Sequence, residues 1–313
     1  MTTAGRPWAL VLVAILVVLN GIVLTVLLTA DGPVGSAAPS PSVPASAAPA
    51  VPIPGAEEPA SQVPTEDPSA TIPLVAPASL ATRQIVAVDG DVAWRSTLAS
   101  CGQGAALVER TLDGGASWDA AELDIDSVVR LRATDAGSAF VVGAAQDCAT
   151  ALASTTDGGD TWSRADATLS SAWFLAPTDR TFVAGPRGDA PVPCPAGAVD
   201  LAAVDVQRGA VLCQDGSLAI SADGGQSWAT TVSVAGARAL TQNGSAYVVA
   251  TFEGPCEALS VYGISSDGQS QNEPLACAPV TTAGDVAVSI TGDLLWVWSG
   301  ADLAISEDGG QTW

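Results

Sequence analysis

The octapeptide TLDGGASW at 111–118 recurs as TTDGGDTW at 155–162, SADGGQSW at 221–228 and SEDGGQTW at 306–313. A degraded fifth copy, SSDGQSQ, begins at Ser265 and lacks the tryptophan. In each copy a short aspartate side chain can accept hydrogen bonds from nearby backbone N–H groups, and the glycines can adopt positive φ without steric cost. The tryptophan that follows has a large apolar face to bury. The octapeptide therefore predicts a tight turn that leads into a strand.

The spacing of the copies indicates a repeat of supersecondary units. The five aspartates are 44, 66, 44 and 41 residues apart, a period that suits four strands per unit. The 66-residue interval contains two apolar hairpins and one octapeptide. It holds either a unit that has lost its octapeptide or a single unit with an insertion, so six units are favoured and five are the alternative. Paired apolar runs joined by turn residues predict six hairpins, at residues 84–94, 128–143, 172–185, 199–213, 238–250 and 284–298.

The four intact octapeptides match the pattern S/T-x-D-x-G-x-T/S-W, and the chain thereby resembles the Asp-box, or BNR, repeat family of β-propellers. The resemblance covers roughly residues 80–313 and implies an all-β fold of four-stranded antiparallel blades. In that family the octapeptide joins the third and fourth strands of a blade, and its tryptophan packs between blades. The resemblance therefore implies a structural role for Thr111, Asp113, Gly115, Trp118, Thr155, Asp157, Gly159, Trp162, Ser221, Asp223, Gly225, Trp228, Ser265, Asp267, Ser306, Asp308, Gly310 and Trp313.

The last blade requires a partner for its outer edge. The final octapeptide ends at Trp313, and no fourth strand follows it in the sequence. A propeller whose last blade is incomplete exposes unpaired backbone groups at a sheet edge. We therefore expect the segment ATIPLVAP at 70–77 to supply the missing strand, so that the propeller spans residues 70–313.

The amino-terminal quarter has a different composition. Residues 8–30 form an uncharged apolar run, which at about 1.5 Å per residue is long enough to cross a bilayer core of roughly 30 Å. Arg6 precedes this run, so we expect a signal anchor with residues 1–7 in the cytoplasm and the propeller on the extracytoplasmic side; a cleaved signal peptide is the alternative. Residues 31–69 are rich in Pro, Ala and Ser and predict a disordered linker. Abundant alanine without lysine is typical of a bacterial protein.

Charge and composition exclude several classes of function. The formal net charge is −22, with 33 acidic residues against 11 basic ones, and an acidic surface repels nucleic acids. The sequence contains no histidine, which excludes histidine-dependent catalytic triads and zinc sites with histidine ligands. The octapeptides also have too few oxygen ligands at alternating positions to form EF-type calcium loops. We therefore expect no metal and no cofactor.

Six cysteines in an extracytoplasmic domain suggest up to three disulfides. Cys101 and Cys148 each follow a predicted second strand by a few residues, in equivalent loops of neighbouring blades. The other four cysteines form two local pairs, each within about twenty residues. Of the fifteen possible sets of pairs, we therefore favour the set Cys101–Cys148, Cys194–Cys213 and Cys256–Cys277.

The resemblance includes enzymes as well as binding proteins. Asp-box sialidases combine an arginine cluster with a tyrosine nucleophile, a glutamate that pairs with it and an aspartate acid/base, and they carry an F/Y-R-I-P motif. Here TRQI at 82–85 shares only the arginine and the isoleucine with that motif. Tyr247 and Tyr262 lie in predicted strands and are interpreted as core or cross-strand residues. Arg130 and Arg132 alternate on one strand and could face the central channel together, but solvated or acid-paired side chains are the simpler interpretation.

No residue is therefore assigned to catalysis. Glu109 and Glu253 lie near strand ends, and nothing in the sequence gives either a specific partner. The chain also resembles the propellers that assist photosystem II assembly, which are binding scaffolds. The favoured function is a non-catalytic, membrane-tethered scaffold that binds a protein or a glycan through its blade loops. A divergent, sialidase-like glycoside hydrolase is the alternative.

Overall fold

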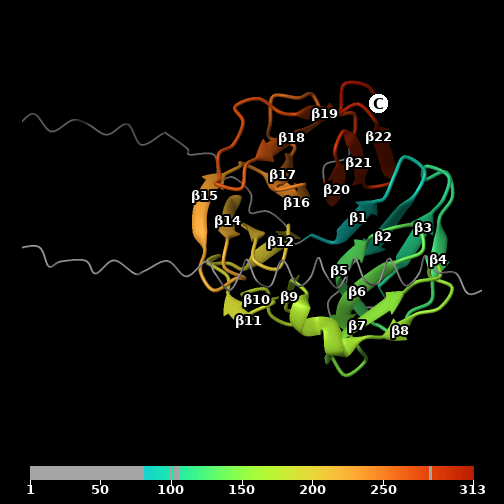
Figure 1. Cartoon of the computed structure of the whole chain (residues 1–313). Helices are drawn as coiled ribbons and strands as arrows, with labels where there is room; N and C mark the ends of the chain where they lie inside the picture. The colour runs from blue at the N-terminus through green and yellow to red at the C-terminus, as the bar shows by residue number, and fades with distance from the viewer. Residues whose placement is uncertain (1–80, 99–100, 102–105, 282–283) are drawn as a thin grey trace, which may run out of the picture. The chain divides into compact units, whose positions relative to one another are not determined.

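Six small antiparallel sheets surround a common axis in the propeller region (Figure 1). The structure is a computed structural model, and it describes residues 81–98, 101, 106–281 and 284–313. The predicted cytoplasmic tail, membrane helix, linker and closing strand lie outside these residues and stay predictions. Among the residues described, no helix is long and apolar enough to cross a membrane.

The first three blades follow one another along the chain, each from its innermost strand outward. They consist of β1 (Arg83–Ala87), β2 (Ala93–Thr97), β3 (Val108–Thr111) and β4 (Asp119–Ala121) in blade 1; β5 (Ser127–Ala133), β6 (Ala139–Ala144), β7 (Thr150–Thr155) and β8 (Ser163–Arg164) in blade 2; and β9 (Phe174–Leu175), β10 (Phe182–Gly185) and β11 (Gly188–Pro191) in blade 3. A short 3₁₀ helix, η1 (Asp166–Ser171), connects blades 2 and 3.

The last three blades repeat the same order. They consist of β12 (Ala198–Ala203), β13 (Gly209–Cys213), β14 (Ser217–Ser221) and β15 (Ala229–Ser233) in blade 4; β16 (Ala237–Asn243), β17 (Ala246–Thr251), β18 (Leu259–Ile264) and β19 (Ala276–Ala278) in blade 5; and β20 (Val286–Thr291), β21 (Leu294–Ser299) and β22 (Asp302–Ser306) in blade 6. The prediction of six blades is confirmed, and the alternative of five is wrong.

Hydrophobic seams hold the blades in a ring. The innermost strands β1, β5, β9, β12, β16 and β20 contact one another in succession, and β20 contacts β1. Each of the six blade interfaces contains one cluster of buried apolar side chains. At the closing interface, Trp296 and Trp298 of blade 6 pack with Ile85 of blade 1. The ring is therefore closed by apolar packing between its first and last blades, and the nearly continuous burial of β20 and β21 is that of strands covered on both faces.

Blade 3 is the trimmed blade that the 66-residue interval predicted. Its sheet has three strands among the described residues, and no octapeptide follows its second hairpin strand. Trp173, directly before β9, fills the space beside the next blade: it is 5% exposed, and its ring meets that of Trp228 edge-on at 6.1 Å. Its indole N–H donates to the Asp205 carbonyl at 2.8 Å. A large side chain thus replaces the packing that a longer sheet would supply.

Each intact octapeptide forms the same hydrogen-bonded turn after the third strand of its blade. In the copy at 111–118, Thr111 Oγ1 donates to Asp113 Oδ1 at 2.8 Å and accepts the Gly115 N–H at 2.9 Å. The Asp113 carboxylate accepts the backbone N–H and the hydroxyl of Ser117, at 2.8 and 2.6 Å. Gly114 and Gly115 have φ of +67° and +82°, which side-chain-bearing residues rarely adopt. The same bonds recur in the other three copies.

The fifth copy keeps only the first half of this turn. Ser265 Oγ donates to Asp267 and accepts the Gln269 N–H at 3.0 Å, as the intact copies do. Gln271 stands where the intact copies carry serine or threonine, and its backbone N–H donates instead to the Gly263 carbonyl at 3.2 Å. Asn272 occupies the position of the tryptophan. The chain beyond Gln269 therefore follows a path of its own.

Candidate functional site: an arginine pocket on the propeller axis

Polar side chains on the innermost strands bind the backbone of the next blade. Gln84 Oε1 accepts the Leu131 N–H at 2.6 Å, which ties blade 1 to blade 2. Asp200 Oδ2 accepts the Leu240 N–H at 2.8 Å between blades 4 and 5. The hydroxyl of Ser289 accepts the Ala87 N–H at 2.9 Å between blades 6 and 1. These bonds satisfy backbone groups that the short inner strands cannot pair within their own sheets.

Bulges interrupt three of the innermost strands. The register shifts between Val128 and Arg130 in β5, between Ala198 and Asp200 in β12, and within the first residues of β16. A bulge leaves one residue out of the ladder and changes the direction of its neighbours. The carbonyl of the bulged residue Val199 accepts the Ala81 N–H at 3.1 Å. Arg130 and Asp200 directly follow their bulges, so these irregularities set how the two charged side chains meet the channel.

The inner strands surround a small pocket of about 40 Å³. We call it the axial pocket. Its lining comes from blades 1, 2, 4, 5 and 6, and includes three arginines from two neighbouring strands. The polar lining residues are Arg83, Gln84, Arg130, Arg132, Asp200, Thr241 and Gln242.

Among the described residues, none of the three arginines of the axial pocket forms a salt bridge, although Asp200 in the same pocket interacts electrostatically with Arg130. Arg130 is 6% exposed and donates to the Leu201 carbonyl at 2.6 Å, across the ring in blade 4. Arg132 donates to Gln242 Oε1 at 3.2 Å. Arg83 donates to the Gly300 carbonyl and lies 4.5 Å from the centre of the Trp298 ring. Arg130 and Arg132 thus both line the axial pocket, as their alternation on one strand allowed, and Arg130 is buried and not solvated.

Burial changes the protonation of the charged groups in this pocket. Desolvation, with the neighbouring charge of Arg132, lowers the pKa of Arg130 to about 9. Asp200 is 8% exposed, and its burial raises its pKa to about 6. The N–H groups of Leu240 and Leu201 and the charges of Arg130 and Arg180 oppose that rise. At neutral pH one carboxylate faces three guanidinium groups, so the axial pocket is positively charged within a protein of net charge −22.

The two tyrosines do not line the axial pocket. Tyr247 is fully buried in the seam between blades 4 and 5, and burial raises its pKa to about 12. Tyr262 lies on β18, the third strand of blade 5. Glu109 forms a salt bridge with Arg95 at 2.7 Å, and that guanidinium lies 4.0 Å from the centre of the Trp118 ring. The arrangement of arginines with a tyrosine and its glutamate, which a sialidase requires, is therefore not assembled in the axial pocket.

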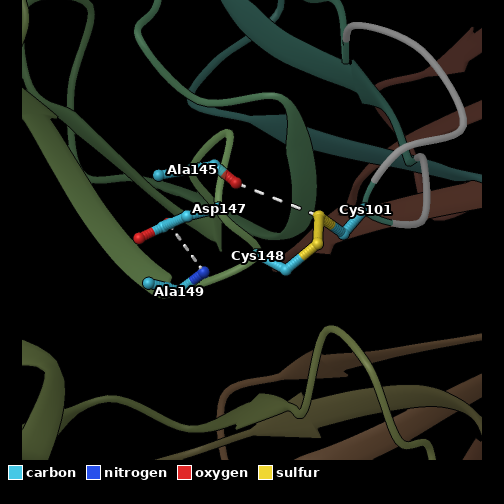
Figure 2. The surroundings of a disulfide bond; sticks show 5 residues. All are labelled: Cys101, Ala145, Asp147, Cys148 and Ala149. Atoms are coloured by element: carbon cyan, nitrogen blue, oxygen red, sulfur yellow. Dashed lines mark hydrogen bonds between the residues drawn. A yellow bond between two sulfur atoms is a disulfide. The ribbon is translucent and has the colours of Figure 1, made fainter.

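Three disulfides fix loops around the ring. They join Cys101 to Cys148, Cys194 to Cys213 and Cys256 to Cys277, the same pairs that the sequence analysis favoured. Figure 2 shows the first of these, which links a loop of blade 1 to the β6–β7 loop of blade 2. In that loop the Cys148 N–H donates to the Ala145 carbonyl at 2.8 Å. Among the described residues, no group of three or more carboxylates and thiols could hold a metal ion.

Comparisons with known proteins give no family. No family model and no curated protein matches the chain. Solved structures with a similar arrangement include YCF48 bound to D1 peptide (19% identity, TM-score 0.29) and the GH74 xyloglucanase from Xanthomonas campestris (18%, 0.30). The match covers 74% of this chain in both cases, and 66% and 37% of those chains. The Aleuria aurantia lectin is matched over 76% of this chain and 100% of its own (11%, 0.42). Similarities this weak carry no argument about activity or ligand.

Proposed function

We propose that the chain is a non-catalytic binding propeller whose ligand carries a carboxylate group that enters the axial pocket. The observation that carries this proposal is the convergence of Arg83, Arg130 and Arg132 on a pocket lined by one carboxylate, with no salt bridge to any of the three among the described residues. The protein has 33 acidic residues, so an internal partner for each arginine would be easy to supply. The excess positive charge that Asp200 does not balance is therefore assigned to a carboxylate of the ligand, a protein or a glycan.

The chemistry of guanidinium groups supports a carboxylate. Each guanidinium has five N–H donors in a planar fork that matches a carboxylate in two-pronged geometry. Arg132 donates to Gln242 Oε1, and its guanidinium has further N–H donors to offer a ligand. Partial burial strengthens such contacts because water competes less for the same donors. A pocket of about 40 Å³ has room for a carboxylate group, while the rest of a chain terminus or a sugar acid would lie outside it.

We further propose the setting of this ligand site in the cell. Residues 8–30 act as a membrane anchor, residues 31–69 as an extended linker, and residues 70–313 as the propeller on the extracytoplasmic side. The apolar run and the Pro-rich composition support the first two assignments. The three disulfides support an oxidising compartment. The repeated turn geometry supports assignment of the octapeptides to the Asp-box type.

Glycoside hydrolysis is less well supported. Most glycosidases use two carboxyl groups on either side of the scissile bond. Asp200 is the one carboxylate that lines the axial pocket, and its two oxygens already accept the N–H groups of Leu201 and Leu240. We therefore expect no release of fluorophore from 4-methylumbelliferyl glycosides, sialosides included. Turnover that Asp200→Asn abolishes would support the hydrolase instead.

The binding proposal is tested with paired probes that differ only in charge. The full chain, in detergent, is titrated calorimetrically with acetylated trialanine as the free acid and as the amide, and with glucuronate and its methyl ester. We expect binding of a free acid and none of its neutral pair. A hydrogen bond to a charged group is worth roughly 1.5–3 kcal/mol, so Arg132→Gln should weaken binding by about 10- to 100-fold.

Arg164→Gln is the matched control, because Arg164 is exposed and paired with Asp166 at 2.8 Å outside the axial pocket. It should leave the affinity unchanged. Equal binding of acid and amide, or equal affinity in the Arg132→Gln variant, would contradict the proposal.

A further inference from the structure

A second pocket lies at the interface of blades 4 and 5, apart from the axis. Its volume is about 320 Å³. It is bounded by the connection between β15 and β16, the loop between β17 and β18, strand β18, and the end of the degraded octapeptide. We call it the flank pocket. The residues that matter for its chemistry are Thr251, Glu253, Tyr262, Ser270, Gln271 and Asn272.

The flank pocket occurs where the fifth octapeptide departs from the repeat. Asn272 stands at the position that tryptophan holds in the intact copies, and Gln271 at the position of serine or threonine. Both carboxamides line the pocket. In the intact copies the corresponding tryptophan packs against neighbouring side chains, as Trp162 does edge-on against Trp94 at 6.0 Å. The fifth copy thus has two hydrogen-bonding side chains in place of a packing residue.

The walls of the flank pocket are held in place by the fold. Thr251 Oγ1 donates to the Ala235 carbonyl at 2.7 Å and accepts the Glu253 N–H at 3.0 Å, so one hydroxyl joins two blades and orients the loop. The same loop is tied to β19 by the disulfide Cys256–Cys277. A site whose loops are fixed before binding loses less entropy when a ligand orders it.

Two glycines leave the space that the polar groups occupy. A Cβ at Gly236, where φ is +62°, would collide with the Glu253 carboxyl group. A Cβ at Gly254 would collide with Ser260 Oγ and would lie 3.0 Å from the Tyr262 hydroxyl. The Glu253 carboxylate and the Tyr262 hydroxyl therefore each rest against bare backbone at the rim of one pocket.

We propose that the flank pocket binds a neutral pyranose sugar. The partly exposed Tyr262 ring offers an apolar platform whose electron-rich face attracts the C–H groups of a sugar ring. One carboxylate, two carboxamides and the hydroxyl of Ser270 offer donors and acceptors in the mixture that adjacent sugar hydroxyls require. Pockets of 300–1,000 Å³ with a few convergent polar groups are typical of small-ligand sites.

The charges around the flank pocket select against other ligands. No arginine lines it, and its one ionisable acid is Glu253, so a sugar acid would be repelled. A single carboxylate also lacks the second carboxyl group that most glycosidases use, so the sugar is bound and not cleaved. The site is independent of the axial pocket, with which it shares no lining residue.

Saturation-transfer NMR tests this proposal. The full chain, in a detergent without a sugar headgroup, is mixed with the methyl glycosides of glucose, galactose, mannose, fucose, xylose and N-acetylglucosamine, and separately with glucosamine and glucuronate as charged probes. We expect transfer to at least one neutral glycoside. Tyr262→Ala should weaken its binding by at least about tenfold, and Glu253→Gln by a similar factor through the loss of a charged acceptor.

Control variants separate this site from the axial pocket and from misfolding. Tyr262→Phe keeps the platform and should retain binding within about threefold, which shows that the fold is intact. Arg132→Gln should leave sugar binding unchanged, and Tyr262→Ala should leave binding of the axial acid probe unchanged. No transfer to any neutral glycoside, transfer that Tyr262→Ala does not reduce, or binding of glucosamine alone would each overturn the proposal.

Discussion

The buried carboxyl group of Asp200 should make the stability of the propeller depend on pH. Its pKa is raised in the folded protein from the usual 3.8 to about 6, chiefly by burial. Between these two values the folded protein holds the proton more tightly than the unfolded chain does. The stabilisation by protonation is therefore complete below pH 3.8 and is lost as pH rises through about 6. The difference between 3.8 and 6 corresponds to roughly 3 kcal/mol.

Asp200→Asn removes this titration. The amide carries no charge at any pH, so the free energy of unfolding of the variant does not gain the contribution that protonation of Asp200 gives the wild-type protein at low pH. Asparagine can accept from only one of the N–H groups of Leu201 and Leu240, which now bond to separate carboxylate oxygens. The loss of that hydrogen bond lowers the free energy of unfolding by about 1–3 kcal/mol, and by nearly the same amount at every pH. The stability of the variant relative to wild type should therefore rise by roughly 2.5 kcal/mol between pH 4 and pH 7.5, because the unfolded chain is already partly protonated at pH 4.

Urea unfolding at pH 4, 5, 6 and 7.5, with the disulfides kept oxidised, measures this difference. Asp189→Asn is the control for the change in net charge, because Asp189 is exposed on β11. Its effect should stay within about 0.5 kcal/mol at every pH. If the Asp200→Asn difference is constant across the series, or if Asp189→Asn reproduces its pH dependence, burial of Asp200 does not have the consequence argued here.

Three further predictions concern the turns and the ring. Thr155→Ala removes a buried hydroxyl that accepts the Gly159 N–H at 3.0 Å, and it should lower the free energy of unfolding, measured in urea, by about 2 kcal/mol. Ser265→Ala, in the exposed fifth turn, should lower it by less than about 1 kcal/mol, and equal losses in the two variants would contradict the turn argument. Hydroxyl and backbone donors lower the pKa of Asp157, Asp223 and Asp308 to about 2, so the stability that these carboxylates contribute is lost as pH falls from 3.8 to 2. The melting temperature of the triple Asp→Asn variant should therefore fall less over that pH range than the melting temperature of wild type. Deletion of residues 70–77 should lower the melting temperature by about 5 °C or more if this segment completes blade 6, and an unchanged melt would refute that closure.

The ring of six blades could be predicted because its determinants are local. An octapeptide turn needs only residues within a span of eight, and Thr111, Asp113 and Ser117 satisfy one another without help from the rest of the chain. Hairpins are local in the same sense, so their number gave the number of blades even where one octapeptide is missing. The cysteine pairs follow from equivalent or adjacent loops. Each of these features is set by contacts that are near in sequence or related by the repeat.

The axial pocket could not be predicted in this way. Arg83, Arg130 and Gln242 are separated by up to about 160 residues, and they meet only because the ring closes. The alternation of Arg130 and Arg132 on one strand was the available signal, since residues two apart share a face. Their burial depends on a bulge in β5 and on an acceptor in blade 4, the Leu201 carbonyl. Neither feature can be recognised from the local sequence, so the sequence alone favoured a surface position for the two arginines.

Both candidate sites lie where the chain departs from its own repeat, and this follows from how a repeat protein is stabilised. Equivalent positions in successive blades face similar packing demands, so residues that packing selects recur, as the octapeptide hydroxyls, aspartates and glycines do. The innermost strands instead place Arg83, Arg130 and Arg132 in one pocket, and the fifth octapeptide places Gln271 and Asn272 in another. Burying charge or giving up a packing tryptophan costs stability, and the turns and seams do not require either. Such costly departures, clustered at two separate pockets, are better explained by ligands than by the fold.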